Sequence, residues 1–356
     1  MFSSILIAII SIVVLLSLHE FGHFIVAKKC GFRVEEFGIG YPPRLWGKKY
    51  GETLYSINLI PFGAHVRIPE AEGEESQGKP RWKRMLVLLG GVVSFWLIAF
   101  ILLTMVFKMG ASQAVSDTEA GLLVNPKVQV LAVAPDSPAD EAGLRSGDAI
   151  KELSVSNYQF SIDKVKDIQD LTEQYKGQEV GLTIERGKEV FTVSLVPRVS
   201  PPEDEGPMGV ALLRTAEKSY SWWQAPQKAA EATWNLTGAV VAGWSNIITG
   251  LFHGNGLPKG VQFVGPVGIG ALISQAAQVG VNYFLQFIAI ISIYLAIFNL
   301  LPIPALDGGK LLFLAIEKIK GRPINRRIEE NVTVAFFALM IILMVWVTIK
   351  DIARLF

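Results

Sequence analysis

The sequence predicts a polytopic α-helical membrane protein with about four transmembrane helices, a membrane-associated β-hairpin or sheet, and an inserted extracytoplasmic α+β domain. Of its 356 residues, 51% are apolar or aromatic and only 18% are charged, against roughly 25% charged residues in a soluble domain. The mean hydropathy is +0.38. The apolar residues gather in long runs toward both ends of the chain, whereas the charged residues gather in the middle.

Composition also excludes several classes. A net charge of +1 means that the chain has no excess of basic residues for binding phosphates, so we expect no nucleic-acid partner. A single cysteine, Cys30, excludes a disulfide scaffold, and we expect it to be an inert thiol near a helix end.

Four apolar runs are long enough to cross a hydrocarbon core of roughly 30 Å. They cover residues 1–27, 85–107, 283–301 and 332–349. A signal peptide fits the first run poorly, because no Lys or Arg precedes it and no small-x-small site follows it. Residues 229–252 carry scattered polar side chains and neighbouring tryptophans, which favours a helix in the membrane interface over a fifth span. We expect residues 199–280 to hold a linker and such interfacial helices.

Charge sets the predicted orientation. Residues 28–84 hold 11 Lys/Arg and 7 Glu, and residues 302–331 hold 6 Lys/Arg. Residues 110–233 hold 12 Lys/Arg and 19 Asp/Glu, a net charge of 12 − 19 = −7. Because short basic loops stay in the cytoplasm, loops 28–84 and 310–331 are predicted inside, and the acidic middle domain and both termini outside.

The middle domain is predicted over residues 125–198. Residues 128–134 and 180–196 alternate in polarity and are rich in β-branched residues, as strands are, and residues 161–175 have a helical pattern. The stretch SPADEAGLRSGDAI (residues 137–150) resembles the PDZ domains of bacterial proteases. Such a domain accepts a peptide by adding a strand to its sheet edge; a spacer or gate without a peptide ligand is the alternative.

The first apolar run contains HEFGH, with His19 and His23 four residues apart and therefore on one helix face. This spacing lets two imidazoles hold one zinc ion while Glu20 acts as general base. Ionisable groups inside apolar sequence are costly and indicate function.

A catalytic zinc site uses three protein ligands and keeps one position open. The other carboxylate inside apolar sequence is Asp307, in NLLPIPALDGG (residues 299–309). Pro302 and Pro304 are predicted to break the third helix, of residues 283–309, just before it. Broken helices at membrane depth are tolerated only where they line a cavity.

Together, HEFGH, NxxPxPxLDG and the PDZ-like stretch resemble the site-2 protease family of intramembrane zinc metalloproteases, in the layout of the bacterial regulator-of-sigma-E type. The resemblance implies one Zn²⁺ held by His19, His23 and Asp307, with Glu20 as base and Asn299 positioning the substrate. The family's second span usually carries a GPxxN-like motif, whereas this chain has GGVVS (residues 90–94). Ser94 stands where the asparagine is expected, which puts a contribution from this span in doubt. GPVGI (residues 265–269) resembles a family stretch before the third span and is interpreted as a gate or structural element.

Residues 53–68 resemble a β-hairpin that turns at residues 61–63. In the family, a sheet here enters the membrane and offers an edge to an unwound substrate, which makes Asn58, Gly63, Pro302 and Pro304 candidate substrate-binding residues. His65 and His253 are expected to be surface residues, with His65 a spare metal ligand as the alternative.

The implied function is cleavage, at the inner membrane of a bacterium, of transmembrane segments that another protease has already trimmed outside. The implied substrates are anti-sigma factors or remnant signal peptides, with the active site near the cytoplasmic side and the lipid bilayer as a partner. A non-catalytic PDZ scaffold and a metal or ion transporter are the alternatives.

Overall fold

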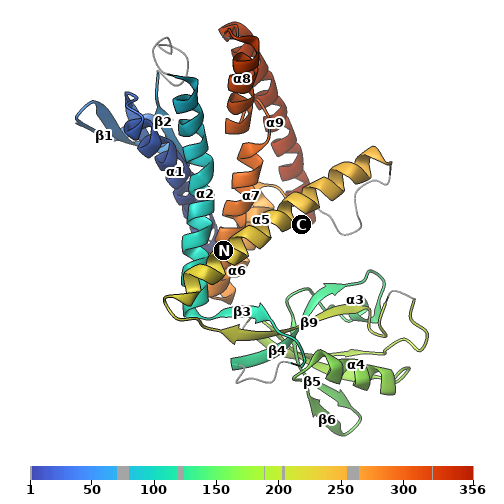
Figure 1. The fold of residues 1–356 in the computed structure, drawn as a ribbon. Helices are drawn as coiled ribbons and strands as arrows, with labels where there is room; N and C mark the ends of the chain where they lie inside the picture. Colours follow the sequence, from blue (N-terminus) through green and yellow to red (C-terminus); the bar gives the residue numbers. More distant parts are fainter. Residues whose placement is uncertain are drawn as a thin grey trace. The chain divides into compact units, whose positions relative to one another are not determined.

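The computed structural model describes residues 2–69, 80–118, 124–187, 189–202, 205–254, 264–322 and 324–355. The chain forms two compact units (Figure 1). Unit 1 comprises Met1–Met105 and Pro226–Phe356, and unit 2 comprises Val106–Ala225.

Unit 1 is built mostly from long helices. Among the described residues, four of its helices are long and apolar enough to cross a membrane, which confirms the four predicted apolar helices. The helices of this unit are α1 (Phe2–Lys29), α2 (Arg81–Met109), α5 (Gln224–Phe252), α6 (Pro266–Val279), α7 (Val281–Leu300), α8 (Asp307–Lys320) and α9 (Arg326–Leu355). The candidate spans lie in α1, α2, α7 and α9; α5, which covers the ambiguous stretch 229–252, is a continuous helix outside that set.

The second predicted cytoplasmic loop, residues 310–331, contains most of a helix. α8 runs from Asp307 to Lys320 and ends at Gly321, whose φ of 70° terminates the helix. The reason is that KLLFLAIEKIK is amphipathic at helical spacing. It buries Leu314 and Glu317 while Ile319 stays exposed.

The predicted hairpin within residues 53–68 is also wrong. The hairpin joins β1 (Glu36–Tyr50) to β2 (Thr53–Arg67), with Tyr50 opposite Thr53. The two halves of β2 do not pair with each other, because residues 36–39 of β1 lie between them and pair with residues 54–57 and with residues 64–67. β2 packs against α1 (Figure 1).

Over its described residues, unit 2 is a seven-stranded sheet with two helices. Its path runs β3-β9-β4-β5-β7-β8, and β6 pairs with β5. The strands are β3 (Ala111–Ala114), β4 (Val124–Val133), β5 (Ala149–Val155), β6 (Tyr158–Ser161), β7 (Val180–Arg186), β8 (Glu189–Leu195) and β9 (Val210–Lys218), and the helices are α3 (Pro138–Glu141) and α4 (Val165–Gln174). The predicted domain end at residue 198 is too early, because β9 lies between β3 and β4 in the sheet. Residues 199–206 (VSPPEDEG), just before β9, are Pro-rich and acidic, a composition typical of a linker, and so the sequence does not reveal the returning strand.

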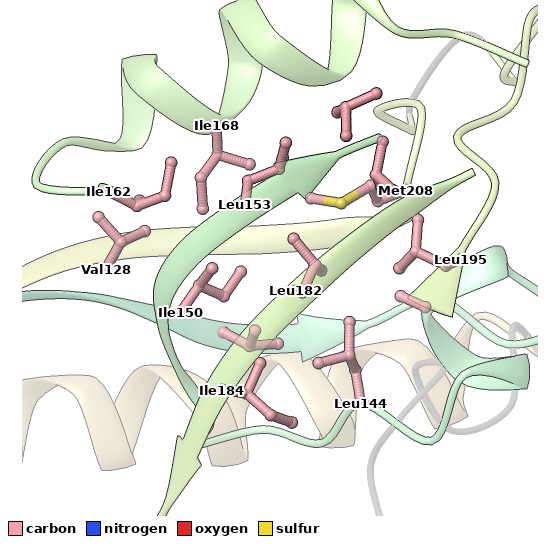
Figure 2. Close-up of a cluster of buried hydrophobic side chains, with 14 residues drawn as sticks. Val128, Leu144, Ile150, Leu153, Ile162, Ile168, Leu182, Ile184, Leu195 and Met208 are labelled. Carbon is pink, nitrogen blue, oxygen red and sulfur yellow. The ribbon is translucent and has the colours of Figure 1, made fainter. Parts of the chain in front are cut away.

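The core of unit 2 lies between the sheet and its helices. Figure 2 shows this cluster, in which Ile150, Leu153, Leu182 and Ile184 are at most 1% exposed. Asp148, at 1% exposure, accepts two hydrogen bonds from Arg186. Burial alone would raise the pKa of Glu185 on β7, but hydrogen bonds from two lysines outweigh it and hold that pKa below its usual value.

Candidate metal centre

The first two groups of the site lie one helical turn apart on α1. His19 and His23 are 7% and 6% exposed, and their Nε2 atoms are 3.3 Å apart. Two imidazole nitrogens this close are at hydrogen-bonding distance, and the same separation suits two ligands of one cation. Because an α-helix has 3.6 residues per turn, side chains four residues apart lie on the same face of the helix.

The third group reaches this pair because α7 stops. α7 ends at Leu300, before Pro302 and Pro304, and α8 starts at Asp307. This confirms the predicted helix break. Asp307 Oδ2 lies 3.3 Å from Nε2 of His19 and 3.3 Å from Nε2 of His23.

The glycines after Asp307 make the tight turn possible. A Cβ on Gly308 would lie 2.1 Å from the carbonyl oxygen of Leu301, and a Cβ on Gly309 would lie 2.2 Å from that of Ile303. Backbone atoms cannot yield as a flexible side chain can. A side chain at either position would therefore push Asp307 away from the histidines.

The three atoms fit a tetrahedral zinc ion. Ligands about 2.0–2.1 Å from a tetrahedral centre lie about 3.3–3.4 Å from one another, and all three separations here are 3.3 Å. His19, His23 and Asp307 form the one group of potential metal ligands found within the described residues. Within those residues, the buried Oδ2 of Asp307 also has no hydrogen-bond partner, as expected of an atom reserved for a metal.

The two imidazoles are oriented by α2. The carbonyl of Val87 accepts a 2.8 Å hydrogen bond from Nδ1 of His23, which places the proton on Nδ1 and leaves the lone pair of Nε2 for a metal. The ring of His19 stacks on Phe95, with centroids 4.4 Å apart and planes at 12°.

The second apolar run contributes more than the sequence indicated. A Cβ on Gly91 would lie 2.1 Å from Nε2 of His23, and a Cβ on Gly22 would lie 2.5 Å from the carbonyl oxygen of Gly90. The paired glycines therefore admit the HEFGH turn of α1 against α2. Ser94, expected to replace an asparagine, donates to the carbonyl of Gly91 and lies against Gly22. A Gly-Gly pair inside an apolar run was the available indication of this contact.

A cavity of about 260 Å³ adjoins the cluster and is lined by Glu20, His23 and Asp307. Four charged side chains also line it: Arg84, Lys310, Glu317 and Glu329. Glu20 therefore faces open space beside two of the clustered ligand residues, where a general base must lie.

Three further residues that could bind a metal, His65, His253 and Cys30, lie outside the cluster. His65 is half-buried: it lines the same cavity and donates from Nδ1 to the carbonyl of Gly40, with part of its side chain still exposed. His65 is not among the clustered ligands. His253 is exposed, as expected, and Cys30 is half-buried directly after the end of α1, the predicted location near a helix end.

The predicted substrate-binding residues are dispersed. Asn299 donates to the carbonyl of Leu295 within α7. Asn58 is buried and donates to the carbonyl of Gly40. Gly63, with φ of 95°, faces Leu16 of α1. Asn299, Asn58 and Gly63 are therefore not among the residues that line the cavity.

Comparison with known proteins identifies the family of the chain. The model of peptidase family M50 matches residues 7–343. The regulator of sigma-W protease RasP of Bacillus subtilis is 29% identical over 95% of this chain and 95% of its own, and the regulator of sigma-E protease RseP of Escherichia coli is 27% identical over 98% of each chain. The zinc metalloprotease RasP of Shouchella clausii is 28% identical over 96% of this chain and 97% of its own.

Among solved structures, the PDZ domain of an SdrC-like protein of Listeria monocytogenes covers 28% of this chain and 93% of its own, at 21% identity and a TM-score of 0.21. The family match spans both the HEFGH helix and the Asp307 segment. The chain therefore belongs to peptidase family M50, the site-2 proteases, and is a zinc metalloprotease.

Proposed function

We propose that His19, His23 and Asp307 hold one catalytic zinc ion, and that Glu20 is the general base for hydrolysis of a peptide bond within a membrane segment. The observation that carries the proposal is the triangle of three ligand atoms, each 3.3 Å from the other two, beside a cavity that Glu20 lines.

Bound zinc supplies Lewis acidity, which polarises a carbonyl and acidifies water at neutral pH. Glu20 takes the proton from the attacking water and then passes it to the nitrogen of the leaving amine. Val87 and Phe95 keep the imidazoles oriented, and this preorganisation limits the rearrangement needed in the transition state.

The substrate is proposed to be a transmembrane segment of a membrane-anchored anti-sigma factor or a remnant signal peptide, already trimmed outside by another protease. Two relatives carry names that make them regulators of sigma factors. A helix must be unwound before it is cut, and an extended segment pairs readily with a sheet edge. Residues 64–66 of β2 line the cavity, so this part of the sheet is the proposed acceptor. Asn58, Gly63, Asn299, Pro302 and Pro304 lie outside the cavity lining and are proposed to support the segments around the substrate path.

The proposed setting is the inner membrane of a bacterium, crossed by α1, α2, α7 and α9 with the site near the cytoplasmic face. The basic loops and the acidic middle domain support this orientation. Unit 2 is proposed to be an extracytoplasmic PDZ domain that screens substrates. Its support is the SPADEAGL stretch, which forms the short helix α3 beside the sheet.

The test uses Glu20→Gln in the full chain, reconstituted in proteoliposomes with a single-span model substrate. We expect zinc content to be retained and cleavage to fall by about 10³-fold or more, since a general base contributes about 10²–10⁴. Glu52→Gln is the matched control, because Glu52 is exposed and pairs with Lys28 on the surface. Undiminished cleavage by Glu20→Gln would refute the mechanism. Peptide binding without cleavage or zinc would instead favour a scaffold, and zinc flux across the vesicles a transporter.

A further inference from the structure

Asp351 is a buried carboxylate outside both the metal cluster and the cavity lining. It is 5% exposed and lies near the end of α9, inside the candidate span Arg326–Ala353. An ionisable side chain is expensive in a membrane segment and persists there when it has a role. Its hydrogen-bond partners indicate that role.

Both partners belong to the start of α6. Oδ2 of Asp351 accepts hydrogen bonds from the backbone N–H of Gly265, at 2.9 Å, and of Gly268, at 2.8 Å. Gly265 is the N-cap of α6 and has no side chain with which to satisfy the first N–H groups. A carboxylate from another helix therefore caps α6, where the helix dipole favours negative charge.

The GPVG sequence, residues 265–268, is shaped to admit this carboxylate. A Cβ on Gly265 would lie 2.8 Å from Oδ2 of Asp351 and 2.9 Å from Cγ1 of Val347. A Cβ on Gly268 would lie 3.0 Å from the same oxygen. Pro266 is at the first helical position and has no backbone N–H, so α6 has one donor fewer that needs a partner.

α9 depends on this contact because little else holds it. Its 18-residue apolar window has no buried residue, and apolar surface gives no drive for association within lipid. Among the described elements, α6 is the one that packs against α9 beyond isolated contacts. At the opposite end of α9, Oγ1 of Thr333 donates to the carbonyl of Pro304, at 3.3 Å.

These two polar contacts link α6 to the segment that presents Asp307. Pro304 lies between the end of α7 and the start of α8. Thr333 and Asp351 are 18 residues apart, about 27 Å along a helix. α6 in turn packs against α1 and α7, so a fixed α6 gives α9 a fixed base.

We propose that Asp351 is a positioning residue for the peptidase: its carboxylate fixes α9 on α6, and α9, through Thr333, steadies the Pro304 segment that carries Asp307. This inference rests on the proposed function. Asp351 touches neither substrate nor metal and acts through α9 as a rod.

The test compares Asp351→Ala, Asp351→Asn, Thr333→Val and the double variant Asp351→Ala/Thr333→Val, each as the full chain in proteoliposomes. Thr348→Val is the matched control, because that hydroxyl donates only within α9, to the carbonyl of Met344. Cleavage rate is expressed per folded, zinc-loaded molecule. Zinc affinity is measured separately by competition with a chelator.

Misplacing a catalytic group by a fraction of an ångström to 1 Å costs up to about 10²-fold, so we expect Asp351→Ala to cleave about tenfold more slowly and to bind zinc more weakly. Asp351→Asn keeps an acceptor oxygen and should stay within about threefold of the wild type, because hydrogen bonds to a neutral acceptor are weaker but still form. Thr348→Val should change neither quantity. The double variant should be no slower than Asp351→Ala, since coupled sites are not additive.

Wild-type rate and zinc affinity in Asp351→Ala would overturn the proposal, as would multiplicative effects in the double variant. If Asp351→Ala lowers only the fraction of protein that folds, while each folded, zinc-loaded molecule cleaves at the wild-type rate, Asp351 is only a structural cap. That result would also overturn the proposal. An inactive wild type would count against the proposed function alone, and the zinc affinities would still decide the role of Asp351.

Discussion

Gly91→Ala tests whether α2 shapes the metal site. The added Cβ would lie 2.1 Å from Nε2 of His23, whereas ordinary contacts begin at 3.4 Å. The imidazole must therefore retreat by about 3.4 − 2.1 = 1.3 Å, or the helices must separate. Its opposite nitrogen is held by the carbonyl of Val87, one turn earlier on α2, so the ring cannot move without losing this bond or its place beside Asp307.

The expected result is a site that binds zinc poorly and cleaves slowly. A displacement of about 1 Å costs about 10²-fold in rate, and disturbing the support of a metal ligand costs about 10–100-fold in affinity or activity. Zinc content of the purified protein by mass spectrometry and cleavage of a single-span substrate in proteoliposomes measure both effects.

Gly238→Ala is the matched control, because Gly238 lies in α5 with open space around its would-be Cβ. This variant should keep wild-type zinc content and rate, and Ala should favour the helix by up to about 1 kcal/mol. Full zinc content and full activity in Gly91→Ala would refute the reasoning. It would show that the contact between α1 and α2 is not needed to place His23.

Four further outcomes are expected. Chelation should abolish cleavage, and zinc but not magnesium should restore it, because imidazole ligands suit zinc; activity that survives metal removal would exclude a metalloprotease. Gly308→Ala, with its Cβ 2.1 Å from a backbone oxygen, should lower stability by about 3 kcal/mol and lower zinc content, measured by thermal unfolding and metal analysis. Asp148→Asn should cost about 2 kcal/mol in the unfolding of unit 2, because it weakens two charged hydrogen bonds from Arg186; an unchanged midpoint in urea would contradict this. The pKa of Glu185 is lowered in the fold, so its stabilising contribution is complete above about pH 4.5 and lost as the pH falls toward the folded value; Glu185→Gln should flatten the acid limb of the unfolding curve.

Much of unit 1 could be predicted because its patterns are local. Length and hydropathy suffice for the spanning helices, and the spacing of His19 and His23 places them on one face of any helix. Pro302 and Pro304 cannot continue α7, and the helix does end at Leu300. The meeting of Asp307 with the histidines was expected because both lie at the same predicted side of the membrane.

What the sequence concealed depends on contacts between distant segments. Residues 36–39 separate the two halves of β2, and no local pattern in residues 53–68 reveals the intervening strand. β9 likewise acquires its place from β3 and β4 on either side of it. The cap on α6 comes from a residue more than 80 positions later, whereas capping rules look for a partner within the same turn.

The glycines at three places explain how polar groups are held inside apolar helices. Gly91 admits the imidazole of His23, Gly308 admits the carbonyl of Leu301, and Gly265 admits the carboxylate of Asp351. Apolar packing in lipid does not by itself draw helices together, so close backbone approach and a few polar contacts must do so. A methyl group at any of these positions fills the space that the neighbouring group occupies, but it changes no ligand and no hydrogen-bonding side chain. Alanine variants there should therefore impair the site although every proposed ligand remains in the sequence.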